Sequence, residues 1–119
     1  IEDGVETILG AFEDKQAGHL LMFGLGGIFV EVFKDVKFRV APLTDLDAQS
    51  MIKSIKSYEI LKGVRGKKSV DIEFIEENIL RLSKLVTDFP EFSEIDLNPF
   101  VFSPNRNKSK ILDARIKLG

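Results

Sequence analysis

The sequence contains no cysteine and a single histidine, His19, in 119 residues. Without cysteine, a disulfide framework, a thiolate-bound zinc ion, an iron–sulfur cluster and a cysteine nucleophile are all excluded. One histidine cannot build a histidine-rich metal site within the chain. The lack of cysteine fits a reducing compartment, and we expect a cytoplasmic protein.

The sequence also lacks an excess of charge of either sign and a long hydrophobic run. It has 17 Lys and Arg against 19 Asp and Glu, a net charge of −2, so it has no broad positive field that would attract duplex nucleic acid or an anionic membrane. The longest apolar stretch, residues 20–32, is interrupted by three glycines and Glu31. As a helix, it is too short to cross the roughly 30 Å hydrocarbon core of a bilayer. We therefore expect neither nucleic acid nor a membrane as a partner.

The overall composition is that of an ordinary globular domain, with 44% hydrophobic and 30% charged residues. A chain of this length fits one domain, and we expect residues 1–119 to form a single unit. Because the first residue is Ile1 rather than Met, we expect the chain to be a fragment of a longer protein.

Alternating apolar residues predict strands in the first 41 residues. A turn is expected at 14–18, and the glycines at 24, 26 and 27 are expected to form a tight connection. The predicted strands are Val5–Phe12, His19–Phe23, Ile28–Phe33 and Val36–Val40.

Two helices are predicted in the middle of the chain. Thr44 is a typical N-cap, and the apolar residues that follow it predict a helix that ends near Ser57, before a loop containing Gly63 and Gly66. Asp71 can cap a second helix, whose apolar stripe runs through Ile72, Ile75, Ile79, Leu82 and Val86. Pro90 ends this helix.

The last third of the chain returns to the alternation of strands, which predicts a hairpin closed by a turn at 103–108. On the first strand, Ile95, Leu97 and Val101 are expected on one side, and the remaining residues on the other: Asp96, Asn98, Phe100 and Phe102. On the second strand, we expect Ile111 to share a face with Asp113, Arg115 and Lys117. Strands joined by hairpins, with the helices grouped between them, predict an α+β fold: a mainly antiparallel sheet covered by two helices on one face.

This hairpin brings polar side chains together. If its loop is centred near Asn105 and Arg106, Asn98 falls opposite Asp113, and Asp96 and Arg115 lie one step away on the same face. A few fixed oxygen ligands are what a hard divalent cation needs, and Mg²⁺ is the natural candidate. The alternative is a hydrated strand face without a specific ligand.

Four further features have both a functional and a structural interpretation. Residues 24–27 can offer backbone N–H groups to a phosphate or form a plain glycine turn. His19 can act as a general base or simply lie at a strand edge. Glu31, alone among apolar residues, must be paired, hydrated or functional. The basic residues within 62–68 can contact a phosphate-bearing ligand or an acidic partner, or form a hydrated loop.

Several short segments, taken in their order along the chain, resemble a known family. They are Phe23–Val32 (FGLGGIFVEV), Val40–Leu43 (VAPL), Leu61–Gly66 (LKGVRG), and Glu94–Pro99 (EIDLNP) followed by Leu112–Arg115 (LDAR). Together they resemble the ATP-grasp beta subunit of ADP-forming acetate–CoA ligase, or acyl-CoA synthetase, in the succinyl-CoA synthetase superfamily. The resemblance extends from about Gly4 to the end of the chain.

The resemblance implies the C-terminal lobe of an ATP-grasp fold, which closes with a second lobe on ATP or ADP and Mg²⁺. It implies Asn98 and Asp113 as the Mg²⁺ ligands and Asp96 as the acidic residue near the histidine that carries the phosphate. We also assign Arg115 to a phosphate contact, and Glu6 and Glu31 to the nucleotide site. The implied partners are an N-terminal ATP-grasp lobe and a CoA-binding alpha subunit or fused region in a hetero-oligomer.

The chain has no counterpart of the N-terminal lobe or of the relay histidine, so we expect it not to turn over alone. The first hypothesis for the parent protein is reversible conversion of acyl-CoA, ADP and phosphate into acid, CoA and ATP through a phosphohistidine. The second is a nucleotide-binding regulatory lobe in an acyl-CoA synthetase-like protein fused to an acetyltransferase.

Overall fold

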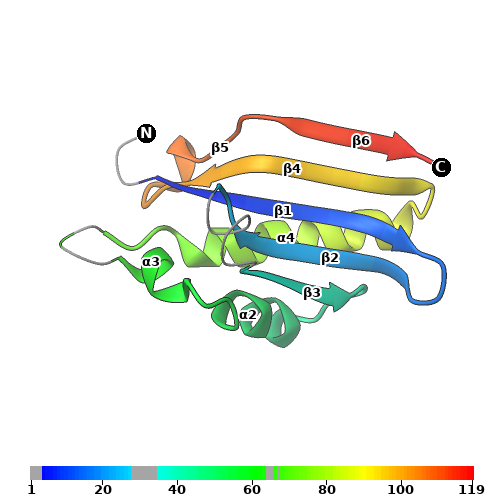
Figure 1. The fold of residues 1–119 in the computed structure, drawn as a ribbon, viewed down its shortest axis with the longest axis horizontal. Coiled ribbons are helices and arrows are strands. Elements are labelled where there is room, and N and C mark those ends of the chain that lie inside the picture. Colours follow the sequence, from blue (N-terminus) through cyan, green and yellow to red (C-terminus); the bar gives the residue numbers. More distant parts are fainter. Residues whose placement is uncertain (1–3, 28–34, 64–65, 67) are drawn as a thin grey trace.

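A computed structural model of the chain describes residues 4–27, 35–63, 66 and 68–119. In these residues three strands precede the helices and three follow them, which confirms the α+β class (Figure 1). The elements are β1 (Val5–Asp14), β2 (Gly18–Leu25), β3 (Val36–Val40), α2 (Asp45–Lys53), α3 (Tyr58–Lys62), α4 (Ile72–Asp88), β4 (Phe92–Phe102), β5 (Lys110–Ile111) and β6 (Ala114–Leu118), with a short 3-10 helix at Arg106–Lys108.

The strands form one antiparallel sheet in the order β3-β2-β1-β4-β5, and β6 also pairs with β4. β4 is therefore bonded on both edges, to β1 from the N-terminal part of the chain and to β5 and β6 from the C-terminal part. Figure 1 shows these strands side by side, with β6 at one edge and β3 at the other.

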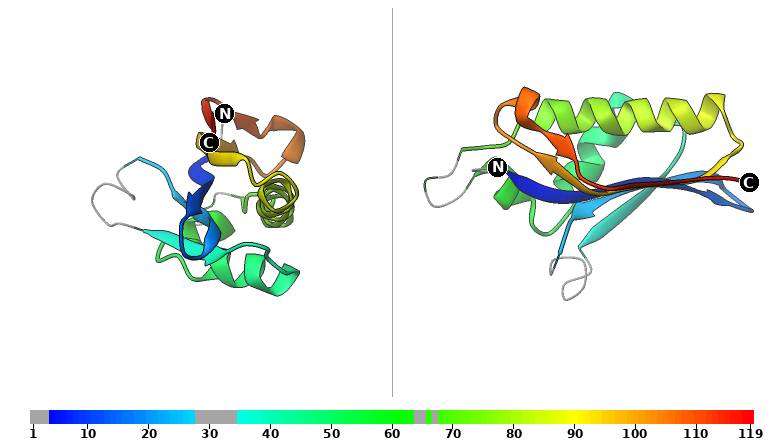
Figure 2. Two further views of the ribbon diagram at one scale, coloured as in Figure 1. Left: turned by 90° about the vertical axis from the view of Figure 1, so that its right-hand side faces the viewer. Right: turned by 90° about the horizontal axis from the view of Figure 1, so that it is seen from above.

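The helices pack on one face of the sheet. α4 contacts β1 and β2, and α2 contacts β2, β3 and α4; the edge-on view in Figure 2 shows α4 running along this face. Alternate strand residues point into the core here, including Leu9, Leu21, Phe23 and Ile95, all 4% exposed or less. In the part of the chain that the structure describes, no helix combines the length and hydropathy needed to cross a membrane.

The predicted helix starts are confirmed. Thr44 and Asp47 form a reciprocal cap on α2: Thr44 Oγ1 accepts from the Asp47 amide at 3.1 Å, and the Asp47 carboxylate accepts from the Thr44 amide at 2.9 Å. Asp71 caps α4, accepting from the Phe74 amide at 3.1 Å.

The expected end of the first helix near Ser57 is wrong: α2 ends at Lys53, and a separate short helix, α3, occupies part of the expected loop. The buried carboxylate of Asp35 explains the break, because it accepts from the amides of Lys56 at 2.5 Å and Ser57 at 2.7 Å. Those amides are then not free to continue the helix. Burial acts to raise the pKa of Asp35, but the hydrogen bonds from Ser57 and Lys56 outweigh it and lower the pKa.

The glycine segment differs from the expectation of a tight connection at 24–27. Gly24 and Leu25 belong to β2, where Gly24 pairs with Ile8 on one side and Val36 on the other. A Cβ atom at Gly24 would collide with the Asp35 carbonyl oxygen, so this glycine allows two backbones to approach closely. The expected strand Ile28–Phe33, with Glu31, lies outside the described residues.

The expected faces of the final hairpin are only partly correct. Ile95 and Leu97 contact the core, but so do Phe100 and Phe102, which were expected on the opposite face. The β1–β4 register shifts between Thr7 and Leu9, so β4 has one extra residue there, and its alternation reverses. The second strand is interrupted at the same level, at residues 112–113, and Ile111 pairs with the core residue Phe100, so Ile111 does not share the face of Arg115.

Gly24 and Gly26, at the end of β2, give a matched pair for a stability measurement. We expect Gly24→Ala to lower the free energy of unfolding by about 1–3 kcal/mol, because the new methyl group meets backbone atoms of residues 35 and 36 that cannot easily move. Gly26→Ala is the control, because its Cβ would meet nothing closer than 3.5 Å, and we expect a change within about 0.5 kcal/mol. Urea denaturation measures both, and equal losses would contradict the close-approach explanation.

Candidate functional site

The predicted register of the β4–β6 hairpin is confirmed. Asp96 pairs with Arg115 across the two strands, and the Asn98 amide donates to the Asp113 carbonyl oxygen at 3.1 Å. Asn98, Asp113 and Arg115 are exposed and Asp96 is half-buried. Four residues singled out from the sequence therefore lie next to one another, on β4, on β6 and at the break just before β6.

These residues belong to the face of the sheet opposite the helices, which we call the open face. Ile95 and Leu97 contact the core, so Asp96 between them points the other way. Cross-strand pairing continues the row of Asp96 through Gly10 and Met22 to Phe38 on β3. Its neighbours on the open face include the aromatic pair Phe12 and Phe38, whose rings meet edge to face at 6.0 Å.

A local irregularity positions the Asn98–Asp113 pair. Pro99 has no amide hydrogen for the ladder, and the extra residue of β4 lies at this level of the strand. Just after this irregularity, a buried hydrogen bond fixes β4 to β1: the Thr7 hydroxyl donates to the Phe100 carbonyl oxygen at 2.8 Å. Bulges of this kind commonly redirect side chains next to functional sites.

Asp96 is electrostatically unusual. One of its carboxylate oxygens, Oδ1, is buried and has no hydrogen-bond partner among the described residues. Burial raises the pKa of Asp96, the nearby carboxylates of Glu94 and Asp113 raise it further, and the charge of Arg115 acts in the opposite direction. A buried carboxylate oxygen without a donor is unfavourable and suits a site that receives a cation or a protonated group.

The side chains in this cluster that could bind a metal all offer oxygen atoms. Asn98 offers an amide oxygen, and Asp96 and Asp113 offer carboxylate oxygens, of which Asp113 Oδ1 already accepts from the Ala114 amide at 2.9 Å. The residues described contain no group of three or more His, Cys, Asp and Glu side chains placed to hold a metal by themselves. Mg²⁺ does not require one, because it commonly uses one or two protein ligands and completes its shell with phosphate oxygens and water.

The other candidate residues named from the sequence do not belong to this cluster of Asp96, Asn98, Asp113 and Arg115. Glu6 is exposed on β1 opposite Val101, and its carbonyl oxygen accepts from the Gly26 amide at 2.9 Å. His19 is 8% exposed, and its Nε2 donates to the Phe92 carbonyl oxygen at 2.7 Å, which is a structural role. Glu31 lies outside the described residues, as does part of the basic loop at 62–68.

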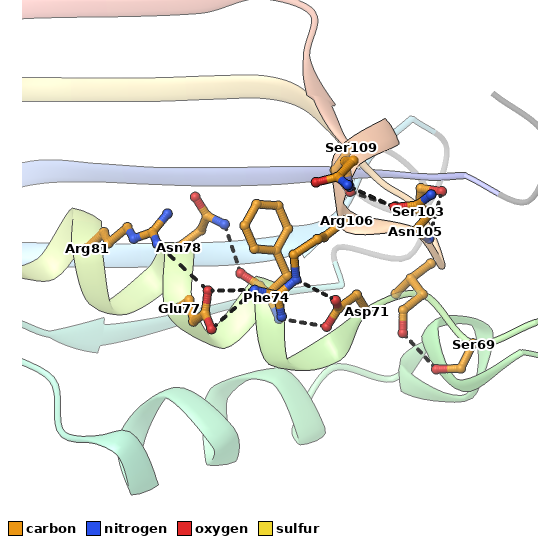
Figure 3. Close-up of polar contacts among 12 residues, drawn as sticks. Ser69, Asp71, Phe74, Glu77, Asn78, Arg81, Ser103, Asn105, Arg106 and Ser109 are labelled. Atoms are coloured by element: carbon orange, nitrogen blue, oxygen red, sulfur yellow. Dashed lines mark hydrogen bonds and ion pairs between the residues drawn. The ribbon is translucent and has the colours of Figure 1, made fainter.

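A second polar cluster was not predicted from the sequence, and we call it the turn anchor: Asp71, Phe74, Glu77 and Arg106 (Figure 3). Arg106 Nε donates to Asp71 Oδ2 at 2.9 Å, Nη1 lies 3.3 Å from Glu77 Oε2, and the guanidinium stacks 4.9 Å from the centre of the Phe74 ring. Arg106 is 35 residues away from Asp71, so no local pattern indicates the pairing.

The ionisation of the turn anchor is cooperative. Burial acts to raise the pKa of Asp71, but the hydrogen bonds from Arg106 and the Phe74 amide outweigh it and lower the pKa. The hydrogen bond to Asp71 raises the pKa of Arg106 in turn. Isolated surface ion pairs contribute only about 0–1 kcal/mol, but this arginine has two carboxylate partners and an aromatic ring.

An antiparallel sheet with helices packed on one face is a fold compatible with a lobe of an ATP-grasp domain. Residues 1–118 match the model of the ATP-grasp domain family, and the chain belongs to that family.

The curated relatives are longer proteins. The chain is 53% identical over 115 residues to the acetate–CoA ligase [ADP-forming] I subunit beta of Pyrococcus furiosus, covering 97% of this chain and 49% of that protein. It is 46% identical over 120 residues to acetate–CoA ligase [ADP-forming] I of Archaeoglobus fulgidus, covering 100% of this chain and 17% of that protein. The chain thus spans half or less of the length of these relatives.

A solved structure has the same fold. The dinucleotide forming acetyl-coenzyme A synthetase 1 of Ca. Korarchaeum cryptofilum, in complex with coenzyme A and Mg-AMPPCP, superposes with a TM-score of 0.90 at 49% identity. The match covers 98% of this chain and 54% of that chain. The sheet and helices described above therefore have the same fold as the corresponding part of that protein.

The raised pKa of Asp96 predicts a gain of stability when its charge is removed. A carboxyl group whose pKa is higher in the folded state than in the unfolded state destabilises the fold above that folded pKa, and has no such effect below its ordinary value of 3.8. We expect Asp96→Asn to raise the free energy of unfolding by roughly 0.5 kcal/mol or more at about pH 7, and the gain to vanish near about pH 3.

Asp71→Asn is the matched control of opposite sign. Asn still caps a helix well, so this change mainly removes the charge that faces Arg106. Because the folded pKa of Asp71 is lowered, its stabilising effect is present above the ordinary value of 3.8 and is lost as the pH falls below it. We expect Asp71→Asn to lower stability at neutral pH. Denaturation midpoints measured across this pH range check both changes, and the same sign for both variants would contradict this electrostatic description.

Proposed function

We propose that the chain is the nucleotide- and Mg²⁺-binding C-terminal lobe, residues 1–119, of an ADP-forming acid–CoA ligase. The parent protein would convert acyl-CoA, ADP and phosphate into acid, CoA and ATP, reversibly, through a phosphohistidine. The observation that carries this proposal is the pairing of Asn98 with Asp113 on the open face, next to the unpartnered oxygen of Asp96. The relatives described above are ligases, which favours turnover over regulatory nucleotide binding alone.

Asn98 and Asp113 are the proposed Mg²⁺ ligands. Both are exposed, Asn98 on β4 and Asp113 just before β6. Both offer oxygen atoms, and the backbone hydrogen bond between them fixes the separation of the two residues. When bound, Mg²⁺ supplies neutralisation of the charge on the nucleotide phosphates during phosphoryl transfer. What the two side chains contribute is position: they hold the phosphate end of the nucleotide over β4 and β6.

Asp96 and Arg115 have complementary proposed roles beside this pair. Asp96 has a desolvated carboxylate oxygen free to accept a hydrogen bond, which suits it to orient the ring of the histidine that carries the phosphate. Arg115, opposite Asp96 and exposed, is suited to contact a phosphate oxygen. Glu6, and Glu31 outside the described residues, are proposed to border the nucleotide.

The open face is the proposed contact surface for the N-terminal ATP-grasp lobe, with the nucleotide between the two lobes. Phe38 and Val40 are 46% and 52% exposed on this face, and apolar side chains at such exposure suit coverage by another protein layer. A CoA-binding alpha subunit or fused region is the further proposed partner, in a hetero-oligomer. The cytoplasmic location expected from the sequence remains a prediction.

The metal assignment is tested by Asn98→Ala and Asp113→Ala in the intact protein with all its subunits. We expect each variant to reduce Mg²⁺-dependent nucleotide turnover at least about tenfold, which corresponds to a loss of roughly 1.4 kcal/mol of transition-state stabilisation. Each removed side chain is exposed, so folding stability is expected to change little. Steady-state rates at several Mg²⁺ concentrations, with a thermal unfolding curve for each variant, provide the measurement.

Asp88→Ala is the matched control for Asp113→Ala. Asp88 is also an exposed carboxylate, and it is paired with Lys84 at 3.0 Å, but it is the last residue of α4, which packs on the face of the sheet opposite the candidate site. We expect its turnover to equal that of the unmodified protein. Normal turnover in both Asn98→Ala and Asp113→Ala would refute the metal assignment.

A further inference from the structure

The side chains of β6, the strand that carries Arg115, pack little against the rest of the protein. Every residue of β6 is exposed, and in the described part of the chain its strand partner is β4 alone. β5 has only two residues. We call residues 110–118, with β5 and β6, the edge ribbon. Because its side chains contribute little burial, its position depends on the β4 ladder and on the turn that joins it to β4.

The turn at 103–109 is rigid within itself. The Ser103 amide donates to Ser109 Oγ at 3.0 Å, the Asn105 amide donates to Ser103 Oγ at 3.3 Å, and the Lys108 amide donates to the Asn105 carbonyl oxygen at 2.9 Å. These bonds close the loop on itself, so the turn moves as one body. Its direction relative to the rest of the fold must be set by contacts that leave the turn.

Arg106 makes such contacts from the middle of the turn. It reaches Asp71, the N-cap of α4, and Glu77 on the second turn of that helix, and it stacks on Phe74 between them, as Figure 3 shows. At the beginning of the turn, the Asp71 amide donates to the Ser103 carbonyl oxygen at 3.1 Å. α4 is itself fixed in the core through Ile75 and Ile79, both fully buried. The turn is thus fastened to a helix that is packed into the core.

We propose that Arg106 is a positioning residue for the divalent-cation site: by fastening the turn to α4, it holds the edge ribbon so that Asp113 stays opposite Asn98. This rests on the proposed function, which assigns the cation to those two side chains. Arg106 does not touch the cation or the nucleotide. Its effect passes through the turn and through two backbone bonds, Asn98 amide to Asp113 carbonyl oxygen at 3.1 Å and Leu112 amide to Pro99 carbonyl oxygen at 2.9 Å.

The pairing of charges favours arginine at this position. The planar fork of a guanidinium reaches two carboxylates at once while its face rests on an aromatic ring, and lysine cannot do all three. Arg81 provides an internal comparison, because it also contacts Glu77, at 3.8 Å, but its side chain is 70% exposed and it belongs to α4 rather than to the turn. A loss of charge at Arg81 therefore disturbs Glu77 without releasing the edge ribbon.

The test compares Arg106→Gln with Arg81→Gln in the intact protein. We expect Arg106→Gln to raise the half-saturating Mg²⁺ concentration about threefold or more with the KM for the acyl-CoA substrate unchanged. This shift is smaller than the tenfold or more typical of residues that touch a metal ligand directly. Arg106→Lys, which keeps the charge but not the fork, is expected to give an intermediate value and covers the case in which the Gln variant folds poorly. Arg81→Gln is expected to leave the Mg²⁺ requirement unchanged.

Amide hydrogen exchange provides the second readout and does not depend on turnover. We expect the amides of Asn98 and Leu112 to exchange at least about threefold faster in Arg106→Gln than in Arg81→Gln. Equal exchange at these amides would overturn the proposal, and so would faster exchange with an unchanged Mg²⁺ requirement. Failure of the proposed function is recognised separately, by normal turnover in Asn98→Ala and Asp113→Ala.

Discussion

β4 is hydrogen-bonded along both edges, and the register of these two ladders determines where each side chain of the candidate site lies. The ladder with β6 places Asp96 opposite Arg115 and Asn98 opposite Asp113. The ladder with β1 has one extra β4 residue at the level of Asn98 and Pro99, which reverses the alternation beyond that point. Because of this reversal, polar residues occupy the open face before Pro99, and phenylalanines enter the core after it.

The same arrangement explains why Asp96 is unfavourable for the fold alone. Strand alternation fixes it on the open face, yet the surrounding strands cover one of its oxygens without providing a donor. A sequence selected only for stability would place a smaller or uncharged residue here. A buried carboxylate oxygen that has no donor among the described residues suits a group that receives a partner during function.

Part of the fold and of the candidate site was predictable from the sequence, because it depends on residues close together in the chain. The hairpin register followed from the centre of a turn near Asn105 and Arg106, and the helix starts followed from caps at Thr44 and Asp71 that act on amides three residues away. The family followed from several short segments in a fixed order, and its oxygen donors from two of them. For the helix starts and the hairpin register, local bonding was sufficient.

The remaining features depend on contacts between distant residues. The end of α2 is set by the carboxylate of Asp35, which precedes Lys56 by 21 positions. The reversal of side-chain alternation at Pro99 depends on the pairing of β4 with β1. The turn anchor joins Arg106 to α4, which begins at Ile72. Strict alternation therefore misplaced Phe100, Phe102 and Ile111. No pattern within a single element contains this information.

The central position of β4 also affects the order in which the protein can fold. The buried bond from Thr7 to Phe100 joins residues 93 positions apart, and β4 is the strand on which β1, β5 and β6 all assemble. During synthesis, the hairpin of β1 and β2 emerges from the ribosome well before its main partner. Its edge then remains unpaired until β4 appears, and contacts of such long separation slow the search for the native state. Cells that make this lobe therefore expose a nascent sheet edge during most of its translation.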